Sequence, residues 1–247
     1  TFEVLALLVL IAVIFFWSRR NISKIKRFWK AEMKGWPKLD ADIILYFEVV
    51  LMVLFLSMNA TDSLLQELDP QHYIKSGSFP VSAFMVPLFD GFSMETLHIM
   101  ERSFWWLHII GIFIFLNYLY YSKHLHILLA FPNTYFANLN SKGKFPVNSN
   151  IKNEVQLMMD PNFAIPDTNE APPEKFGASD VFDLNWVQLM NAYSCTECGR
   201  CSSVCPANLT GKKLSPRKVM MDTRDRLEEI GKSLNKNKGV FEKDSKQ

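Results

Sequence analysis

Three long apolar runs dominate the first half of the chain. They cover residues 2–17, 43–58 and 104–121 and are rich in Leu, Ile, Val and Phe. Each is close to the roughly 17 to 25 residues that a helix needs to cross the hydrocarbon core of a bilayer. A buried core helix is the alternative, but such helices are usually shorter and carry a polar face. The ends of the runs carry aromatic residues typical of a membrane interface: Trp17, Trp105, Trp106, Tyr118, Tyr120 and Tyr121.

The second half of the chain has a different pattern. Residues 132–179 show little apolar periodicity and are predicted to be a linker. A short helical pattern resumes near residue 180 and ends at the first cysteine, and a second begins at Ser215 and Pro216 and continues to about Leu234. We therefore predict an all-α protein with a transmembrane bundle in residues 1–131, a linker in 132–179 and a helical domain in 180–247.

The distribution of charge predicts an orientation for the three spans. Residues 18–42 contain eight Lys and Arg residues, whereas residues 59–103 contain only Lys75 and Arg102 among six acidic residues. By the positive-inside rule the first of these loops is cytoplasmic, so the chain returns to the cytoplasm after the third span. We expect a multi-pass protein of the bacterial inner membrane, in contact with lipid. The net charge of +2 over 247 residues gives no argument for a nucleic-acid partner.

All four cysteines of the chain lie within eleven residues, as Cys-x2-Cys-x2-Cys-x3-Cys-Pro. This is the spacing by which bacterial ferredoxins bind a [4Fe-4S] cluster, a one-electron redox centre. Structural zinc sites usually use two separated ligand pairs, and a disulfide is disfavoured in a reducing compartment. The predicted metal ligands are Cys195, Cys198, Cys201 and Cys205.

Two histidines near the third span suggest a second cofactor. His108 and His126 are eighteen residues apart, which is five turns and about 27 Å of a continuous helix, so both would leave one face. We expect them to be axial ligands of two haems, rather than to hydrogen-bond a neighbouring helix. His124 would point about 160° away and is not counted as a ligand.

Three charged residues are assigned more open roles. Arg102 and Lys123, near the two ends of this helix, either neutralise haem propionates or are ordinary interfacial anchors. Glu48 lies inside the second apolar run and either relays quinone protons or faces the membrane interface.

The stretch from His108 to Tyr135, HIIGIFIFLNYLYYSKHLHILLAFPNTY, resembles the last membrane helix of the nitrate reductase gamma-type cytochrome b subunit. Ser122, Lys123 and His126 match its Ser-basic element before the inner haem histidine. The resemblance implies two haems b, each held by one histidine of this helix and one of an earlier helix, with quinone chemistry beside one haem. The two earlier apolar runs contain no histidine, so the partner ligands would come from another span or subunit.

The cysteine motif with its flanking helices resembles the helical two-cluster ferredoxin module of heterodisulfide reductase-type proteins. In such modules three cysteines of each motif bind one cluster and the Cys-Pro cysteine binds the other. Cys205 therefore either completes a single cluster or serves a second one, and we expect a chain truncated at both ends with two clusters in the full protein. The resemblance implies a cytoplasmic redox partner, in some relatives with CCG domains.

Together these patterns predict an electron-transfer subunit of a quinone-linked respiratory oxidoreductase, with menaquinone or ubiquinone as the quinone. The alternative is a non-redox membrane anchor whose cluster only stabilises a docking domain. A redox sensor would need a downstream module, and the residues after Leu234 offer only a charged tail. No nucleotide-binding loop or Ser-His-Asp set is present, so bond-making catalysis is not indicated.

Overall fold

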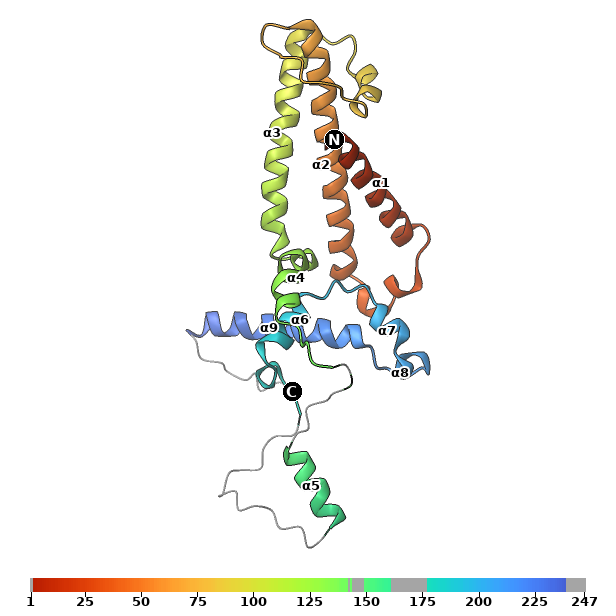
Figure 1. Cartoon of the computed structure of the whole chain (residues 1–247), viewed down its shortest axis with the longest axis vertical. Helices are drawn as coiled ribbons and strands as arrows, with labels where there is room; N and C mark the ends of the chain where they lie inside the picture. The colour runs from red at the N-terminus through yellow and green to blue at the C-terminus, as the bar shows by residue number, and fades with distance from the viewer. Residues whose placement is uncertain (1, 142, 144–148, 161–176, 239–247) are drawn as a thin grey trace. The chain divides into compact units, whose positions relative to one another are not determined.

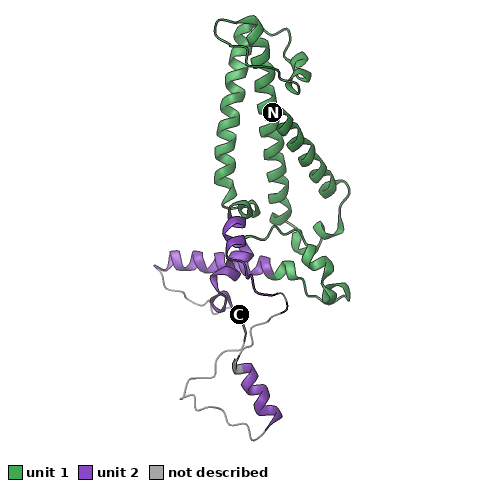
Figure 2. Ribbon diagram, viewed as in Figure 1, with its two compact units in different colours: residues 1–128, 194–219 green, residues 129–193, 220–247 purple. Residues whose placement is uncertain are grey.

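The computed structural model describes residues 2–141, 143, 149–160 and 177–238. Within these residues all regular secondary structure is helical, which confirms the predicted all-α class (Figure 1). The chain divides into two compact units (Figure 2). Unit 1 comprises residues 1–128 and 194–219, and unit 2 comprises residues 129–193 and 220–247. The division predicted from the sequence, at residues 131 and 179, stays a prediction.

Unit 1 is built on three long helices: α1 (Phe2–Asn21), α2 (Trp36–Leu68) and α3 (Met94–Leu119). All three are long and apolar enough to cross a membrane, as predicted, with a mean hydropathy of 2.2, 2.2 and 1.5 over their most apolar windows. Only 17%, 22% and 6% of those windows is buried within the protein. Most of the apolar surface therefore faces outward, where a bilayer would cover it.

Helix α2 is the centre of unit 1, because α1 and α3 both pack against it (Figure 1). Gly111 of α3 faces the Leu51 side chain, and a Cβ at Gly111 would lie 2.8 Å from Leu51 Cδ2. The absence of a side chain at Gly111 thus lets the two backbones approach closely. The Leu51 side chain therefore occupies the space beside Gly111.

Helix α1 runs antiparallel along α2. Near one end, Trp17 Nε1 donates to Tyr46 Oη at 3.1 Å, and near the other, Asn59 Nδ2 donates to Glu3 Oε1 at 3.1 Å. The Glu3 carboxylate also accepts hydrogen bonds from Val81 N, at 2.9 Å, and from Ser82 Oγ. These bonds fasten the connection between α2 and α3, which contains η3 (Ser82–Phe84) and η4 (Val86–Leu88), onto the bundle.

The third helix ends earlier than the sequence indicated. It stops at Leu119, and the chain turns through η5 (Lys123–Leu125) before α4 (His126–Tyr135) begins. Ser122 adopts an extended conformation and its Oγ accepts from His124 N at 3.1 Å, while Asp40 Oδ2 of α2 accepts from Lys123 N at 3.1 Å. The expectation that His108 and His126 lie on one face of a continuous helix is therefore wrong.

Unit 2 contains α5 (Ser149–Met159), η6 (Val181–Asp183), α6 (Trp186–Tyr193) and most of α4 and α9 (Pro216–Lys236). Asp180 and Asp183 form a capping box at η6, and Arg226 of α9 donates to both Asp180 oxygens at 3.2 and 3.0 Å. Helices α6 and α9 correspond to the two predicted after residue 180. Helix α5 lies inside the predicted linker, whereas residues 161–176 lie outside the described residues.

Candidate functional site

The cysteine segment follows a tightly turned backbone in unit 1. Between Cys195 and α7 (Arg200–Val204), Glu197 and Gly199 both have left-handed conformations, with φ of 56° and 72°. Glu197 N donates to Cys195 Sγ at 3.4 Å. Cys201 lies on α7, and Cys205 precedes α8 (Pro206–Leu209), whose first residue is the proline of the motif. The turns bring backbone N–H groups around the first thiols.

The Cys198 thiol has an environment that suits a ligand of an iron-sulfur cluster. The pKa of Cys198 lies below its ordinary value: burial raises it, but the N–H of Arg200, the Thr196 side chain and the charges of Arg200 and Arg27 outweigh burial. A thiolate is the form that binds iron, so this environment favours a ligand. Among the described residues no group of three His, Cys, Asp or Glu side chains is gathered as a metal site, so the assignment rests on spacing and environment.

A buried lysine fastens the cysteine segment to the membrane helices. Lys123 Nζ forms an ion pair with Glu197, which lies between Cys195 and Cys198, and donates to Pro37 O at 2.5 Å. Its Nζ is also 4.0 Å from Asp40 Oδ2, and the Lys123 side chain is only 8% exposed. Burial lowers the pKa of Lys123, while the charges of Glu197 and Asp40 oppose that shift. The sequence left two roles open for Lys123, a haem propionate partner or an interfacial anchor, and in the structure its ammonium already has carboxylate partners.

A second buried cation fixes the other side of the segment. Arg217 is 1% exposed, and its Nη2 donates to Glu32 Oε1 at 2.8 Å. Its Nη1 donates to Arg27 O at 2.6 Å and to Glu197 O at 3.4 Å. The guanidinium lies against Gly199, where any Cβ would collide with it. Gly199 is therefore needed both for its left-handed backbone and for this close approach.

A cavity of about 630 Å³ adjoins the cysteine segment within unit 1. Its apolar walls come from α1 and α2, and its polar lining includes Glu48, Lys123, His124, His126 and Cys198. Arg27 also lines it, and the buried Arg27 Nε has no hydrogen-bond partner among the described residues. A buried cationic N–H without an acceptor is costly, so a bound anionic group here would stabilise the site.

Two histidines share this cavity. His126 Nδ1 lies 3.0 Å from Lys123 O, and a hydrogen bond to that carbonyl would leave Nε2 available as a ligand. The rings of His124 and His126 are 5.5 Å apart. Burial, together with the neighbouring His126, lowers the pKa of His124. The sequence excluded His124 because a continuous helix would turn it away, and the break before α4 changes its direction.

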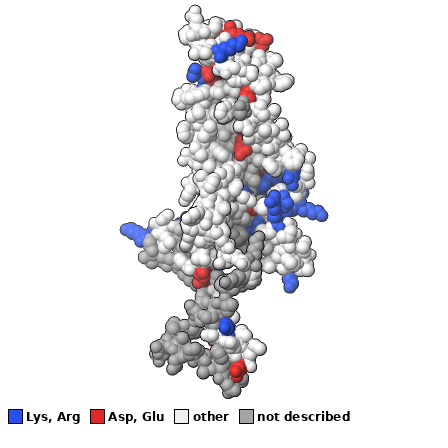
Figure 3. Space-filling model, in the orientation of Figure 1, with Lys and Arg blue, Asp and Glu red and all other residues white. Residues whose placement is uncertain are grey.

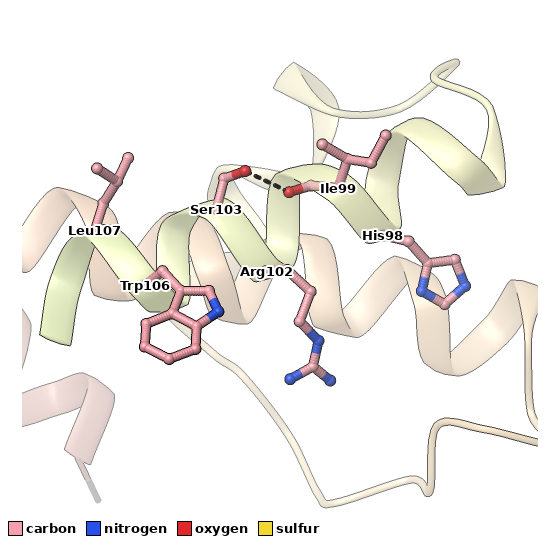
Figure 4. Close-up of a pocket in the computed structure, with 6 residues that line it drawn as sticks. All are labelled: His98, Ile99, Arg102, Ser103, Trp106 and Leu107. Carbon is pink, nitrogen blue, oxygen red and sulfur yellow. Dashed lines mark hydrogen bonds between the residues drawn. The ribbon is translucent and has the colours of Figure 1, made fainter. Parts of the chain in front are cut away.

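The other predicted residues do not join this cavity. His108 Nδ1 lies 3.0 Å from Leu51 O, in the helix-to-helix hydrogen bond that was the alternative to haem ligation. Arg102 lies near the opposite end of α3, where its Nε contacts Glu101 Oε2 at 3.0 Å. Figure 4 shows Arg102, Trp106 and His98 along one side of α3, where they line a shallow pocket of about 610 Å³.

His98 in this pocket has two polar neighbours. Its Nδ1 lies 3.1 Å from Tyr73 Oη, and its Nε2 lies 3.4 Å from Asp69 Oδ2. The structure thus brings Glu48, Lys123, His126 and Cys198 together and leaves His108 and Arg102 apart from them.

Comparison with known proteins gives three informative relatives. The chain is 30% identical over 232 residues to FadF of Bacillus subtilis, described as an iron-sulfur-binding oxidoreductase, covering 94% of this chain and 29% of FadF. It is 27% identical over 219 residues to the EtfAB:quinone oxidoreductase of Syntrophomonas wolfei, covering 87% of this chain and 27% of the relative. A membrane-anchored ferredoxin of Chromohalobacter salexigens is 39% identical over 56 residues, which are 23% of this chain and 8% of that protein.

The names of these relatives, with the apolar helices, support an iron-sulfur oxidoreductase-related membrane protein. The chain spans less than a third of the length of each relative. No protein-family model matches the chain, and no solved structure matches it. The apolar helices and the name of the membrane-anchored ferredoxin agree on a membrane protein, and the names of two relatives support iron-sulfur binding.

Proposed function

We propose that this chain carries electrons between a quinone pool, haem b and a cytoplasmic [4Fe-4S] cluster in a respiratory oxidoreductase of the bacterial inner membrane. The observation that carries the proposal is the shared cavity. Its lining includes Cys198 of the cluster motif, His126 and apolar side chains of two membrane helices. A redox group in that cavity would lie beside the cluster. Electrons could then pass directly between the two groups.

The cluster site is assigned to Cys195, Cys198 and Cys201, with Cys205 either completing it or binding a second cluster. When bound, the cluster supplies reversible one-electron transfer. The protein contributes rigid placement: Lys123 and Arg217 each hold the Glu197 turn from buried positions. The name of FadF, an iron-sulfur-binding oxidoreductase, supports this assignment.

Haem b is assigned to His126, whose Nε2 is available if Nδ1 donates to Lys123 O. A haem supplies one-electron transfer at a potential that its axial ligands set. The unpaired Arg27 Nε is a better candidate for a propionate than Lys123, whose ammonium is paired with Glu197. His108 stays a predicted ligand of a second haem, and Leu51 beside Gly111 would have to move to admit it.

The quinone role draws support from the relative named as a quinone oxidoreductase. Oxidation of one quinol, menaquinol or ubiquinol, releases two electrons and two protons. Glu48 lines the cavity from α2 and is assigned as a proton acceptor. Arg102, which lines the other pocket near the opposite end of α3, is assigned as a partner of a haem propionate or as an interfacial anchor. A cytoplasmic redox subunit, with or without CCG domains, is proposed as the partner of the cluster.

The test is a potentiometric titration of the purified full-length protein. Visible spectra should show haem reduction, and low-temperature electron paramagnetic resonance should show a reduced cluster, both on adding a quinol analogue. His126→Met should alter the haem spectrum, Cys198→Ser should remove the cluster signal, and the exposed His72→Gln should change neither. A cluster that keeps one oxidation state throughout would instead establish the non-redox anchor.

A further inference from the structure

One tryptophan in the connection between α1 and α2 is held in a fixed position at the surface. Trp29 is 43% exposed, and its Nε1 donates to Arg20 O at 3.0 Å. Two ammonium groups lie against its ring: Lys38 Nζ is 4.0 Å from the ring centroid and Lys24 Nζ is 5.4 Å from it. Cation–π attraction to one aromatic ring therefore gathers two positive charges at one place.

The backbone at Lys24 supports a built arrangement. Lys24 has a φ of 45°, one of three left-handed residues other than glycine in the described part of the chain. Residues other than glycine rarely adopt this conformation, and such strain persists only where the surroundings impose it. The turn after α1, in which Ile22 N and Ser23 N both donate to Ser18 O, supplies that constraint.

The two lysines of this site carry charges that no acidic side chain in the described part of the chain neutralises. Neither Lys24 nor Lys38 has an ion pair within the described residues, whereas the acids of the same region are already engaged. Asp42 is paired with Arg20 at 3.5 Å, Asp40 accepts from Tyr118 and Lys123, and Glu32 binds Arg217. The Lys24–Trp29–Lys38 site therefore keeps its positive charge. Figure 3 shows Lys and Arg gathered over this part of unit 1, with few charges along the adjacent helices.

We propose that the Lys24–Trp29–Lys38 site binds the phosphate of an anionic phospholipid, such as phosphatidylglycerol. Lys24 and Trp29 lie in the connection that follows the end of α1 at Asn21, and Lys38 lies in the first turn of α2, which begins at Trp36. Both helices are apolar enough to span a bilayer. The site therefore lies at the level of the lipid headgroups, where tryptophan is favoured and basic residues attract anionic lipid. Trp36, the first residue of α2, is also exposed.

Native mass spectrometry of the full-length detergent-solubilised protein, titrated with phosphatidylglycerol or phosphatidylcholine, tests the site. The double variant Lys24→Gln/Lys38→Gln should bind phosphatidylglycerol roughly tenfold more weakly. The matched control Lys26→Gln/Lys34→Gln removes the same charge from exposed lysines of the same connection and should change binding less than about twofold. Phosphatidylcholine binding should be the same in all three proteins.

Lipid binding and thermal stability of a charge-conserving variant provide a further control. Lys24→Arg/Lys38→Arg keeps both charges and should retain binding, and its thermal midpoint should match wild type. Equal losses of phosphatidylglycerol binding in the two double Gln variants would overturn the proposal, because the lipid would then respond to the overall positive charge of the connection. No loss of binding in either variant would also overturn it. Displacement of the lipid by an equal concentration of inorganic phosphate would also overturn it, because the site would then take free phosphate.

Discussion

The two ends of the membrane bundle in unit 1 each fasten a remote segment with a buried carboxylate, but with different partners. At the end where α1 begins, the nearly buried Glu3 accepts from Asn59, Val81 and Ser82, which are all neutral donors. At the cysteine end, Glu197 and Glu32 are held by Lys123 and Arg217. Removing one neutral donor costs a modest amount of folding free energy. Removing one member of a buried ion pair costs more, because the other charge is then buried without a partner.

The largest expected effect is at Lys123. Lys123→Met removes the ammonium between Glu197 and Asp40 and should destabilise the protein by about 3–5 kcal/mol, as for other broken buried ion pairs. Thermal unfolding and the rate of cluster loss measure the effect. Lys123→Met/Glu197→Gln should recover part of the loss, because one of the stranded charges is then gone. Equal stability of the single and double variants would show that the pair is not coupled.

Glu32→Gln should have the next largest effect, about 2–3 kcal/mol at neutral pH, because Arg217 then loses its charged acceptor. Burial raises the pKa of Glu32, but the hydrogen bond from Arg217 and the other bonds outweigh burial and lower it. The carboxylate therefore stabilises the fold above its unfolded pKa, and the contribution is lost as the pH falls through the lower folded pKa. Denaturation curves of wild type and Glu32→Gln should converge only once the pH falls below the lowered folded pKa of Glu32. A constant gap would contradict this.

At the opposite end of the bundle, Glu3→Gln should cost less, about 1–2 kcal/mol, because the amide keeps one acceptor oxygen for neutral donors. Hydrogen exchange should increase in residues 79–84, which Glu3 anchors, and stay unchanged in residues 195–205. A loss at Glu3 that equals the loss at Lys123 would remove the contrast between the two ends.

The smallest effect is expected in unit 2. Asp180→Asn weakens the ion pair between Asp180 and Arg226. The Asp180 side chain is 26% exposed and the Arg226 side chain is 29% exposed. Partly exposed ion pairs are screened by solvent and contribute little, so the thermal midpoint should be indistinguishable from wild type. A clear shift of the midpoint would show that this cap stabilises unit 2 more than its exposure indicates.

The helices were predictable because their signals are local. Apolar runs of the length needed to cross a bilayer gave α1, α2 and α3, and Ser215 with Pro216 marked the start of α9. The fastening of the cysteine segment was not predictable. Lys123 and Glu197 are 74 residues apart, and Arg217 and Glu32 are 185 apart, so no sequence period connects them.

The candidate site was predictable in part for the same reason. Cysteine spacing is a local pattern and gave Cys198, and the role of Glu48 was proposed from its place in an apolar run. His124 was missed because a helical projection assumes an unbroken helix, and the break depends on Asp40, 83 residues from Lys123. Tertiary hydrogen bonds of this kind override a locally helical pattern.

The interruption between Leu119 and His126 also affects how this region can tolerate changes in length. In an unbroken helix, one inserted residue turns everything that follows by about 100°. Here the chain leaves the helix at Tyr120 and is recaptured at Lys123 by Asp40, so the short turn between them can absorb an added residue. Helical geometry therefore does not fix the spacing of His108 and His126, because each histidine has its own surroundings.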